Sequence, residues 1–407
     1  MDVTLADIEN ARRLIAGEVL RTPLLPAPRL SALTGAQVFV KYENLQVTNS
    51  FKERGALVKL GSLSEAERKR GLIAMSAGNH AQAVAYHGAR LGIPVTIVMP
   101  VTTPFVKVEA TRAHGASVVL HGDTIADAQE RCEALAAEHG FILVHPYDDP
   151  HIIAGQGTIA LEMLEAEPAL DMLVVPIGGG GLIAGNAIAA RAVKPGIEIV
   201  GAEARLYPSV WDALTQGNLP VGGPTLADGI AVKNVGRLTL PIIRELVSGI
   251  VLVDEAQLER AVNAFMILQK TVAEGAGAAG LAALLTEPER FKGRRVGLIL
   301  TGGNIDPRIL ASVMMRELQR ESRIFSFRLT IPDRPGVLGQ IATRLGALGA
   351  NILEVDHKRK LLDVPAKGAK LDVTVETRDL AHAQEISRAL AADGYAPQRI
   401  ESGDAMD

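Results

Sequence analysis

Short runs of apolar, mostly β-branched residues alternate with helical spacing between about residues 37 and 320. Each run is apolar at consecutive positions, as expected for strands that are buried on both faces of a parallel sheet. The clearest runs lie at residues 38–40, 95–98, 117–120, 173–175, 197–200 and 296–300. The intervening segments with the apolar spacing of helices include 80–91, 182–193 and 258–272. Because strands and helices alternate, this part of the chain is predicted to have an α/β fold.

The pattern changes near residue 322. Residues 323–331 alternate between apolar and polar side chains, which predicts a half-buried strand, and a turn rich in proline then leads into a helix over 337–348. The remaining predicted elements are strands at 351–353 and 371–376, a helix at 380–392 and a last strand at 398–400. The order βαββαβ is that of a small ferredoxin-like domain. We therefore predict two domains, residues 1–320 and residues 325–402.

Composition and charge limit the classes of partner. The net charge of −4 gives no electrostatic reason to expect a nucleic acid or an anionic membrane as a partner. The single cysteine, Cys132, cannot form an internal disulfide, and it fits a reducing compartment as a small buried side chain in a helix over 125–139. The first residues lack the basic and apolar regions of a signal peptide, and no stretch approaches the roughly 20 apolar residues of a membrane span. We expect a cytoplasmic protein.

Lys52 stands at a predicted helix start. Ser50 and Glu53 have the spacing of a capping box, which predicts that a helix begins at Ser50. Lys52 then falls in the first turn, where the helix dipole disfavours a cation and helps the amine to lose its proton. A lysine needs this loss before it can condense with an aldehyde. Taken alone, a solvated lysine beside a cap explains the segment at least as well.

Four glycines, residues 178–181, lie between a predicted buried strand and a helix. Their bare backbone N–H groups at a helix N-terminus are suited to a phosphate group. A second interpretation is a dinucleotide site, because Gly179, Gly181 and Ala184 fit G-x-G-x-x-A and Glu203 follows 22 residues after Gly181. A tight turn with no ligand is the third. This segment alone does not separate phosphate binding from dinucleotide binding.

Two further strands end in small and polar residues, at 75–80 and at 300–304. Small residues at the carboxyl ends of parallel strands leave room for a ligand in the crevice above the sheet. The side chain of His80 is predicted to be hydrogen-bonded locally at a helix start. Glu274 is interpreted as a helix cap, either facing this crevice or serving only as a cap.

Taken together, these segments resemble the threonine dehydratase and serine racemase branch of the fold-type-II pyridoxal-phosphate enzymes. The resemblance covers residues 1–320. It rests on five motifs in the family's order, namely Ser50-Phe51-Lys52, Ser76-Ala77-Gly78-Asn79-His80, the four glycines before Leu182, Ala227-Asp228-Gly229-Ile230 and Thr301-Gly302-Gly303-Asn304. It implies pyridoxal 5'-phosphate as cofactor and two doubly wound parallel-sheet lobes, the smaller one, about residues 41–146, being inserted in the larger.

The resemblance also implies a role for each matched residue. Lys52 is the catalytic residue and would form the Schiff base. The other cofactor-binding residues would be Phe51 behind the ring, Asn79 at the ring hydroxyl, Gly178, Gly179, Gly180, Gly181 and Leu182 at the phosphate, Thr301 at the pyridine nitrogen, and Gly229 and Glu274. The substrate carboxylate would be received by Ser76, Ala77, Gly78, Asn79 and His80.

Two positions favour elimination of water. The neutral hydroxyl of Thr301 does not hold the pyridine nitrogen protonated, so the ring is a weaker electron sink and loss of a β-substituent is favoured. Racemases of this branch carry a second serine where this chain has Ala77. The racemases' metal site also pairs the position of Glu203 with an aspartate six residues later, where this chain has Ser209, so no tight metal site is expected, although a looser cation near Glu203 stays open.

The expected reaction is therefore the dehydration and deamination of L-threonine to 2-oxobutyrate and ammonia, with L-serine as a poorer substrate. A racemase-like or other β-eliminating enzyme of the same family is the first alternative. A nicotinamide-dependent (NAD) oxidoreductase using the Gly179–Glu203 pattern is a remote one, and a non-catalytic amino-acid sensor is a third. Each of the last two leaves Lys52 unexplained.

Residues 325–400 resemble an ACT domain, a small amino-acid-sensing module. The resemblance rests on residues 333–338 and 349–352. It implies a regulatory site for an amino-acid effector, with isoleucine or valine as the logical candidates, and a homodimer or homotetramer. The candidate regulatory residues are Gly336, Val337, Leu338, Asn351 and Ile352. A dimerisation module without a ligand is the alternative.

Overall fold

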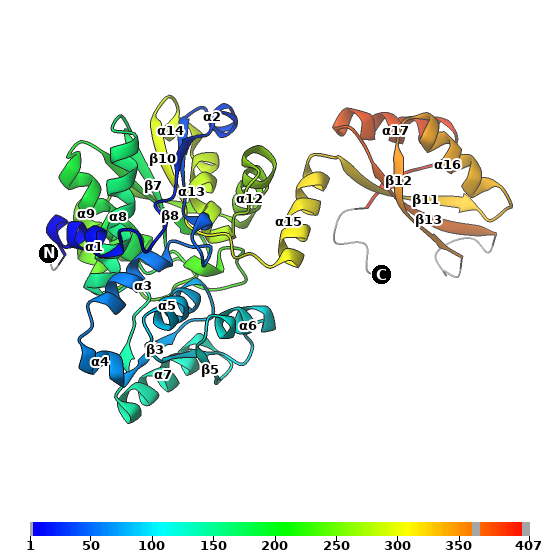
Figure 1. Cartoon of the computed structure of the whole chain (residues 1–407). Helices are drawn as coiled ribbons and strands as arrows, with labels where there is room; N and C mark the ends of the chain where they lie inside the picture. Colours follow the sequence, from blue (N-terminus) through cyan, green and yellow to red (C-terminus); the bar gives the residue numbers. More distant parts are fainter. Residues whose placement is uncertain (1–2, 360–366, 401–407) are drawn as a thin grey trace. The chain divides into compact units, whose positions relative to one another are not determined.

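The computed structural model describes residues 3–359 and 367–400, and its contacts divide the chain into two compact units, Met1–Asp306 and Pro307–Asp407 (Figure 1). This division groups the helix α15, Pro307–Arg320, with the second unit. The domain boundary that the sequence pattern places at 320–325 stays a prediction. In the described residues, no helix is both long and apolar enough to span a membrane.

The larger sheet of the first unit is parallel except for one edge strand. Its order is β1-β2-β10-β7-β8-β9, and only β1 runs antiparallel to its neighbour. The strands are β1 (Leu24–Pro26), β2 (Gln37–Tyr42), β7 (Met172–Ile177), β8 (Glu198–Ala204), β9 (Gly249–Val253) and β10 (Arg295–Leu300). Every residue of β7 is buried, as the continuous apolar run predicts for a central parallel strand.

A smaller parallel sheet, in the order β5-β4-β3-β6, is built from the chain between β2 and β7. Its strands are β3 (Leu72–Met75), β4 (Val95–Met99), β5 (Ser117–Leu120) and β6 (Ile142–Leu143). The helices on this lobe are α5 (Asn79–Arg90), α6 (Phe105–Ala113) and α7 (Ile125–His139). Cys132 of α7 is buried in an apolar cluster. All six predicted strands of the first unit are thus confirmed, and β9 is one that the sequence analysis did not find.

Helices cover the larger sheet. Two of them, α8 (Pro150–Ala166) and α9 (Gly181–Val193), pack closely because glycines face each other: a side chain at Gly157 would lie 2.7 Å from the Gly185 carbonyl oxygen. The helix α3 (Lys52–Gly61) packs on both α8 and α5 and therefore lies between the lobes (Figure 1).

The other helices of the first unit are α1 (Leu5–Ile15), α2 (Pro28–Thr34), α4 (Glu65–Arg70), α10 (Ser209–Thr215), α11 (Thr239–Leu246), α12 (Glu255–Gln269), α13 (Gly275–Thr286) and α14 (Pro288–Phe291), with 3₁₀ turns η1 (Glu43–Leu45) and η2 (Asp228–Ile230).

The second unit has a separate antiparallel sheet of order β12-β13-β11-β14. Its elements after α15 are β11 (Ile324–Pro332), α16 (Val337–Ala347), β12 (Asn351–Lys358), β13 (Gly368–Glu376), α17 (Leu380–Ala392) and β14 (Gln398–Arg399). They follow the predicted order βαββαβ, and Phe327, Leu329, Leu371 and Val373 lie in the buried cluster between sheet and helices.

Candidate active site

The start of α3 is held by the end of β10. Ser50 forms an isolated antiparallel bridge with Gly302, and the Phe51 N–H donates to the Thr301 carbonyl oxygen at 3.0 Å. The predicted capping box is therefore wrong. The helix begins at Lys52 without a side-chain cap, and the Glu53 carboxylate instead accepts from the Thr48 N–H. This pairing places Lys52 beside Thr301, as the two motifs together require.

The amine of Lys52 is partly buried and points at the segment that follows β6. Its Nζ donates to the Pro146 carbonyl oxygen at 2.7 Å and lies 5.2 Å from the centre of the Phe51 ring. Burial lowers the pKa of Lys52 to about 8, against the opposing effect of the Glu274 charge. With a pKa near 8, about one amine in ten is neutral at pH 7. The geometry thus supplies the neutral amine that condensation with an aldehyde needs.

The four glycines join β7 to α9 and leave no room for side chains. A Cβ at Gly179 would overlap the Tyr147 ring, and one at Gly181 would lie 2.7 Å from the Tyr147 carbonyl oxygen. Gly180 has a left-handed backbone, with φ of +94°, which favours glycine. The first N–H groups of α9 have no partner within the helix. The loop therefore offers bare backbone donors at a helix N-terminus, which fits a phosphate group.

A second cluster lies beside Lys52 and joins the ends of β3 and β10. Asn79 Nδ2 donates to Glu274 Oε1 at 2.6 Å, and Asn304 Nδ2 donates to Asn79 Oδ1 at 2.9 Å. Gly302 leaves the space next to the carboxyl group of Glu274, and a Cβ at Gly229 would lie 3.8 Å from Oε1. Burial, with Asp228 nearby, raises the pKa of Glu274 to about 7. The Glu274 side chain thus points toward Asn79, and it does not cap α13.

The loop from Ser76 to Asn79 is half-buried at the carboxyl end of β3. Ser76 Oγ accepts from the Gly78 N–H at 3.2 Å. His80 turns away: its Nε2 lies 2.8 Å from the Val144 carbonyl oxygen, so the predicted local hydrogen bond is wrong. Burial and the charge of Lys52 lower the pKa of His80 to about 3, so its ring is neutral.

Glu203 is occupied by the protein itself. Its carboxylate accepts the N–H groups of Val210 and Trp211 at 2.8 and 2.9 Å, at the start of α10. A ribose of a dinucleotide would have to compete with both bonds, which disfavours the G-x-G-x-x-A interpretation. Among the residues that the structure describes, no group of three or more His, Cys, Asp or Glu side chains is arranged to hold a metal ion.

Sequence reasoning missed Pro146 and Tyr147. The segment connects three parts of the site, since Pro146 accepts from Lys52, the Tyr147 ring covers Gly179, and the Tyr147 hydroxyl donates to the Asn234 carbonyl oxygen at 3.0 Å. The one signal in the sequence that could have indicated this segment is that it directly follows an apolar stretch. That stretch contains β6, which is too short to be recognised as a strand from the sequence. The sequence analysis included Asn304 in a motif but assigned it no role. In the structure its side-chain amide donates a hydrogen bond to Asn79.

The charge of Glu274 gives a pH prediction. Because ionised Glu274 raises the pKa of Lys52, Glu274→Gln removes that effect and keeps an acceptor for Asn79. The pKa of Lys52 then falls below about 8, and the neutral amine prevails at lower pH. We expect the pH midpoint for cofactor attachment to full-length, cofactor-depleted protein to move down by about one unit or less. Attachment is followed by visible absorption. An unchanged or higher midpoint would contradict this coupling.

Comparisons with known proteins agree with this geometry. A family model described as pyridoxal-phosphate dependent enzyme matches residues 15–302. An L-threonine ammonia-lyase of Thermotoga maritima is 42% identical over 395 residues, which make up 97% of this chain and 98% of that protein. An L-threo-3-hydroxyaspartate ammonia-lyase of a Pseudomonas species is 43% identical over 310 residues, 76% of this chain and 97% of that protein. A maize serine racemase structure has a TM-score of 0.73 at 33% identity, covering 79% of this chain and 100% of that one.

The likeness confirms the predicted fold-type-II arrangement of the first unit. The residues present fit the cofactor. The lowered pKa of Lys52 suits its aldehyde, and a loop in which side chains at Gly179 and Gly181 would clash suits its phosphate. The nicotinamide alternative and the sensor without catalysis are thereby set aside. The chain belongs to the pyridoxal-phosphate dependent enzyme family.

Proposed function

We propose that the protein converts L-threonine to 2-oxobutyrate and ammonia, with L-serine to pyruvate as a lesser activity. The water lost in the elimination is taken up again when the unsaturated product is hydrolysed, so the net loss is ammonia alone. The observation that carries this proposal is the similarity to a threonine ammonia-lyase over 97% of the chain, together with the partly buried amine of Lys52. Ala77 supports elimination over racemisation, because a methyl group cannot exchange a proton on the second face of the substrate.

Each residue of the site has a part in this proposal. Bound pyridoxal phosphate supplies an electron sink for the negative charge that develops at the substrate Cα. Lys52 holds the cofactor, and its neutral amine takes the Cα proton as general base. The Ser76–Asn79 loop binds the substrate carboxylate through its N–H groups and the Ser76 hydroxyl. The neutral Thr301 hydroxyl keeps the pyridine nitrogen unprotonated, which favours departure of the β-hydroxyl.

The test compares three substrates and four reactions on the purified full-length protein. We expect 2-oxobutyrate and ammonia from L-threonine, with a higher kcat/KM than pyruvate formation from L-serine. L-threo-3-hydroxyaspartate tests the specificity of the Pseudomonas relative, and conversion of L-serine to D-serine tests the racemase alternative. A protein that racemised serine faster than it deaminated threonine, or that preferred the acidic substrate, would overturn the assignment.

For the second unit we propose an ACT domain that senses an amino acid. Its support is the βαββαβ order and a cavity of about 260 Å³ beside the turn between β11 and α16. The cavity is lined in part by Gly336, Val337 and Leu338. Its charged lining residues are Arg334 and the ion pair of Arg359 with Asp333, so it combines apolar surface with charges of both signs that suit an amino acid. Asn351 and Ile352 do not line it. Isoleucine and valine are the proposed ligands, and a homodimer or homotetramer is the proposed assembly, to be measured by light scattering.

The regulatory proposal predicts that isoleucine or valine binds and changes the rate of threonine turnover. Leu338→Asp places a charge in the apolar part of the cavity and is expected to weaken binding by at least about tenfold, while turnover without effector is unchanged. Leu353→Asp is the matched control, because Leu353 is an exposed leucine of the same unit outside the cavity. Calorimetric titration measures the binding. Equal loss in both variants, or no binding in the unmodified protein, contradicts the assignment.

A further inference from the structure

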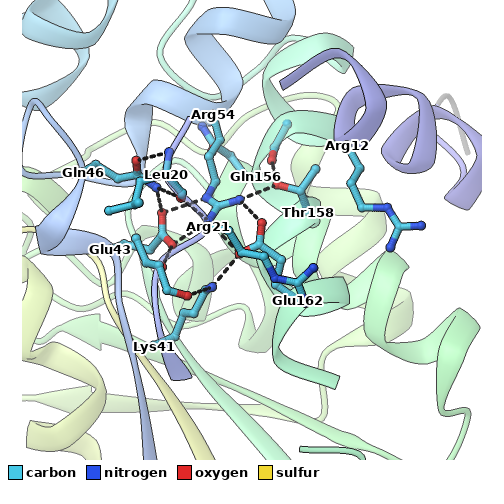
Figure 2. A network of polar contacts seen from close by, with 12 residues as sticks. Arg12, Leu20, Arg21, Lys41, Glu43, Gln46, Arg54, Gln156, Thr158 and Glu162 are labelled. Carbon is cyan, nitrogen blue, oxygen red and sulfur yellow. Dashed lines mark hydrogen bonds and ion pairs between the residues drawn. The ribbon is translucent and has the colours of Figure 1, made fainter. Parts of the chain in front are cut away.

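A buried network of charges surrounds Arg54, two residues after Lys52 on α3 (Figure 2). Arg54, in the first turn of α3, has no exposed surface and lies between Glu43 of η1 and Glu162 of α8. Its Nε and Nη2 donate to the two Glu43 oxygens, both at 2.8 Å, and its Nη1 and Nη2 donate to the two Glu162 oxygens at 2.7 and 2.9 Å. Arg54 therefore holds two carboxylates with two forked contacts.

The rest of the network leaves its charges balanced. Lys41 of β2 donates to Glu162 and to the Thr22 carbonyl oxygen, and the Thr22 hydroxyl donates to Glu43. Burial disfavours ionised Glu43, but the Arg54 guanidinium outweighs it and lowers the pKa of Glu43 below its usual range. The carboxylates of Glu43 and Glu162 thus face the two cations Lys41 and Arg54. Such a network is satisfied and rigid, but stability does not explain it well, because apolar side chains of similar volume are often as stable.

The place of Arg54 on the helix suggests what the network does. Residues two apart on an α-helix point about 200° apart, so Lys52 and Arg54 leave the first turn in nearly opposite directions. Lys52 reaches the Pro146 carbonyl oxygen, whereas Arg54 reaches Glu162 of the larger lobe. No side-chain cap holds this end of α3, which also packs on α5 of the smaller lobe. Arg54 is the side chain that ties the turn bearing Lys52 to η1 and α8.

We propose that Arg54 is a positioning residue for Lys52: its double fork onto Glu43 and Glu162 fixes the first turn of α3 so that the Lys52 amine is presented to the cofactor and the substrate. A lysine at position 54 keeps the charge but cannot make two forked contacts at once. The inference rests on the proposed role of Lys52. It adds that Arg54 connects the position of Lys52 to the larger lobe.

The test uses full-length Arg54→Lys and, as a second variant, Arg54→Met. The matched control is Lys59→Met, which removes a partly buried cation from the other end of the same helix, where Lys59 pairs with Asp149 at 2.6 Å. Three quantities are measured: the thermal midpoint, the rate at which added pyridoxal phosphate re-attaches to cofactor-depleted protein, and kcat and KM for threonine.

We expect Arg54→Lys to slow re-attachment and lower kcat by at least about tenfold with a smaller change in KM, because small displacements of a reacting group are costly. Lys59→Met is expected to lower the thermal midpoint and to re-attach the cofactor at the parental rate. Should Arg54→Lys lower the midpoint and re-attach normally, Arg54 is a structural residue only and the proposal falls. If Arg54→Met does not fold, Arg54→Lys decides alone. A protein that attaches the cofactor but does not turn over threonine would sink the proposed substrate and leave the re-attachment comparison valid.

Discussion

Lys52→Ala is expected to abolish covalent attachment of the cofactor and to lower kcat for threonine by at least about a thousandfold, since general bases alone contribute 10²–10⁴-fold. The amine has two tasks in the proposed function, holding the cofactor and taking the Cα proton, and alanine can perform neither. The neighbouring histidine, His80, does not replace the amine, because the Nε2 atom of its neutral ring lies against the Val144 carbonyl oxygen. Borohydride trapping followed by peptide mass spectrometry measures the attachment.

The control for this loss is Lys59→Ala, on the same helix but paired with Asp149. It should keep the visible absorption of the bound cofactor and most of the threonine turnover. Two results would refute the role of Lys52. One is a trapped cofactor on another lysine, and the other is a parental turnover rate in Lys52→Ala with the absorption band intact.

The fold could be predicted largely because its strands are buried on both faces, so that apolar runs mark them without help from distant residues. The elements of the second unit could be predicted equally well, and its helix at Leu380–Ala392 has the predicted ends. The capping box failed for the opposite reason. Ser50 and Glu53 have the right spacing, yet Ser50 is bound to Gly302, some 250 positions away, and that tertiary pairing decides where the helix begins.

The site could be predicted as a set of motifs and not as a set of contacts. Resemblance gathered Lys52, Asn79 and Thr301 into one crevice, and the backbone bridge between residues 50 and 302 is consistent with it. It did not indicate that Asn79 donates to Glu274, or that Arg54 reaches Glu162 across 108 positions. Such partners are set by how α3, α8 and α13 pack, which no local pattern records.

Gly185→Ala is expected to destabilise the first unit by about 1–3 kcal/mol or more, the usual cost of overfilling a packed core. Gly185 lies on α9, where a Cβ would overlap the Ile153 carbonyl oxygen and lie 2.7 Å from the Gly157 nitrogen. Both obstacles belong to the backbone of α8, so a change of rotamer cannot relieve them. The helices must therefore separate. This separation would also displace the glycine loop at the start of α9 and Glu162 on α8, and we expect it to lower the affinity for the cofactor.

The matched control is Gly280→Ala, in the buried helix α13, where the added methyl would lie 3.5 Å from the Val174 carbonyl oxygen, an ordinary contact. Alanine favours a helix over glycine by up to about 1 kcal/mol, and both variants gain this equally. The difference between their thermal midpoints, measured at one scan rate with saturating cofactor, therefore isolates the clash between α8 and α9. Equal midpoints would mean that these helices can separate at little cost, and the close contact between Gly157 and Gly185 would then not be what holds the glycine loop in place.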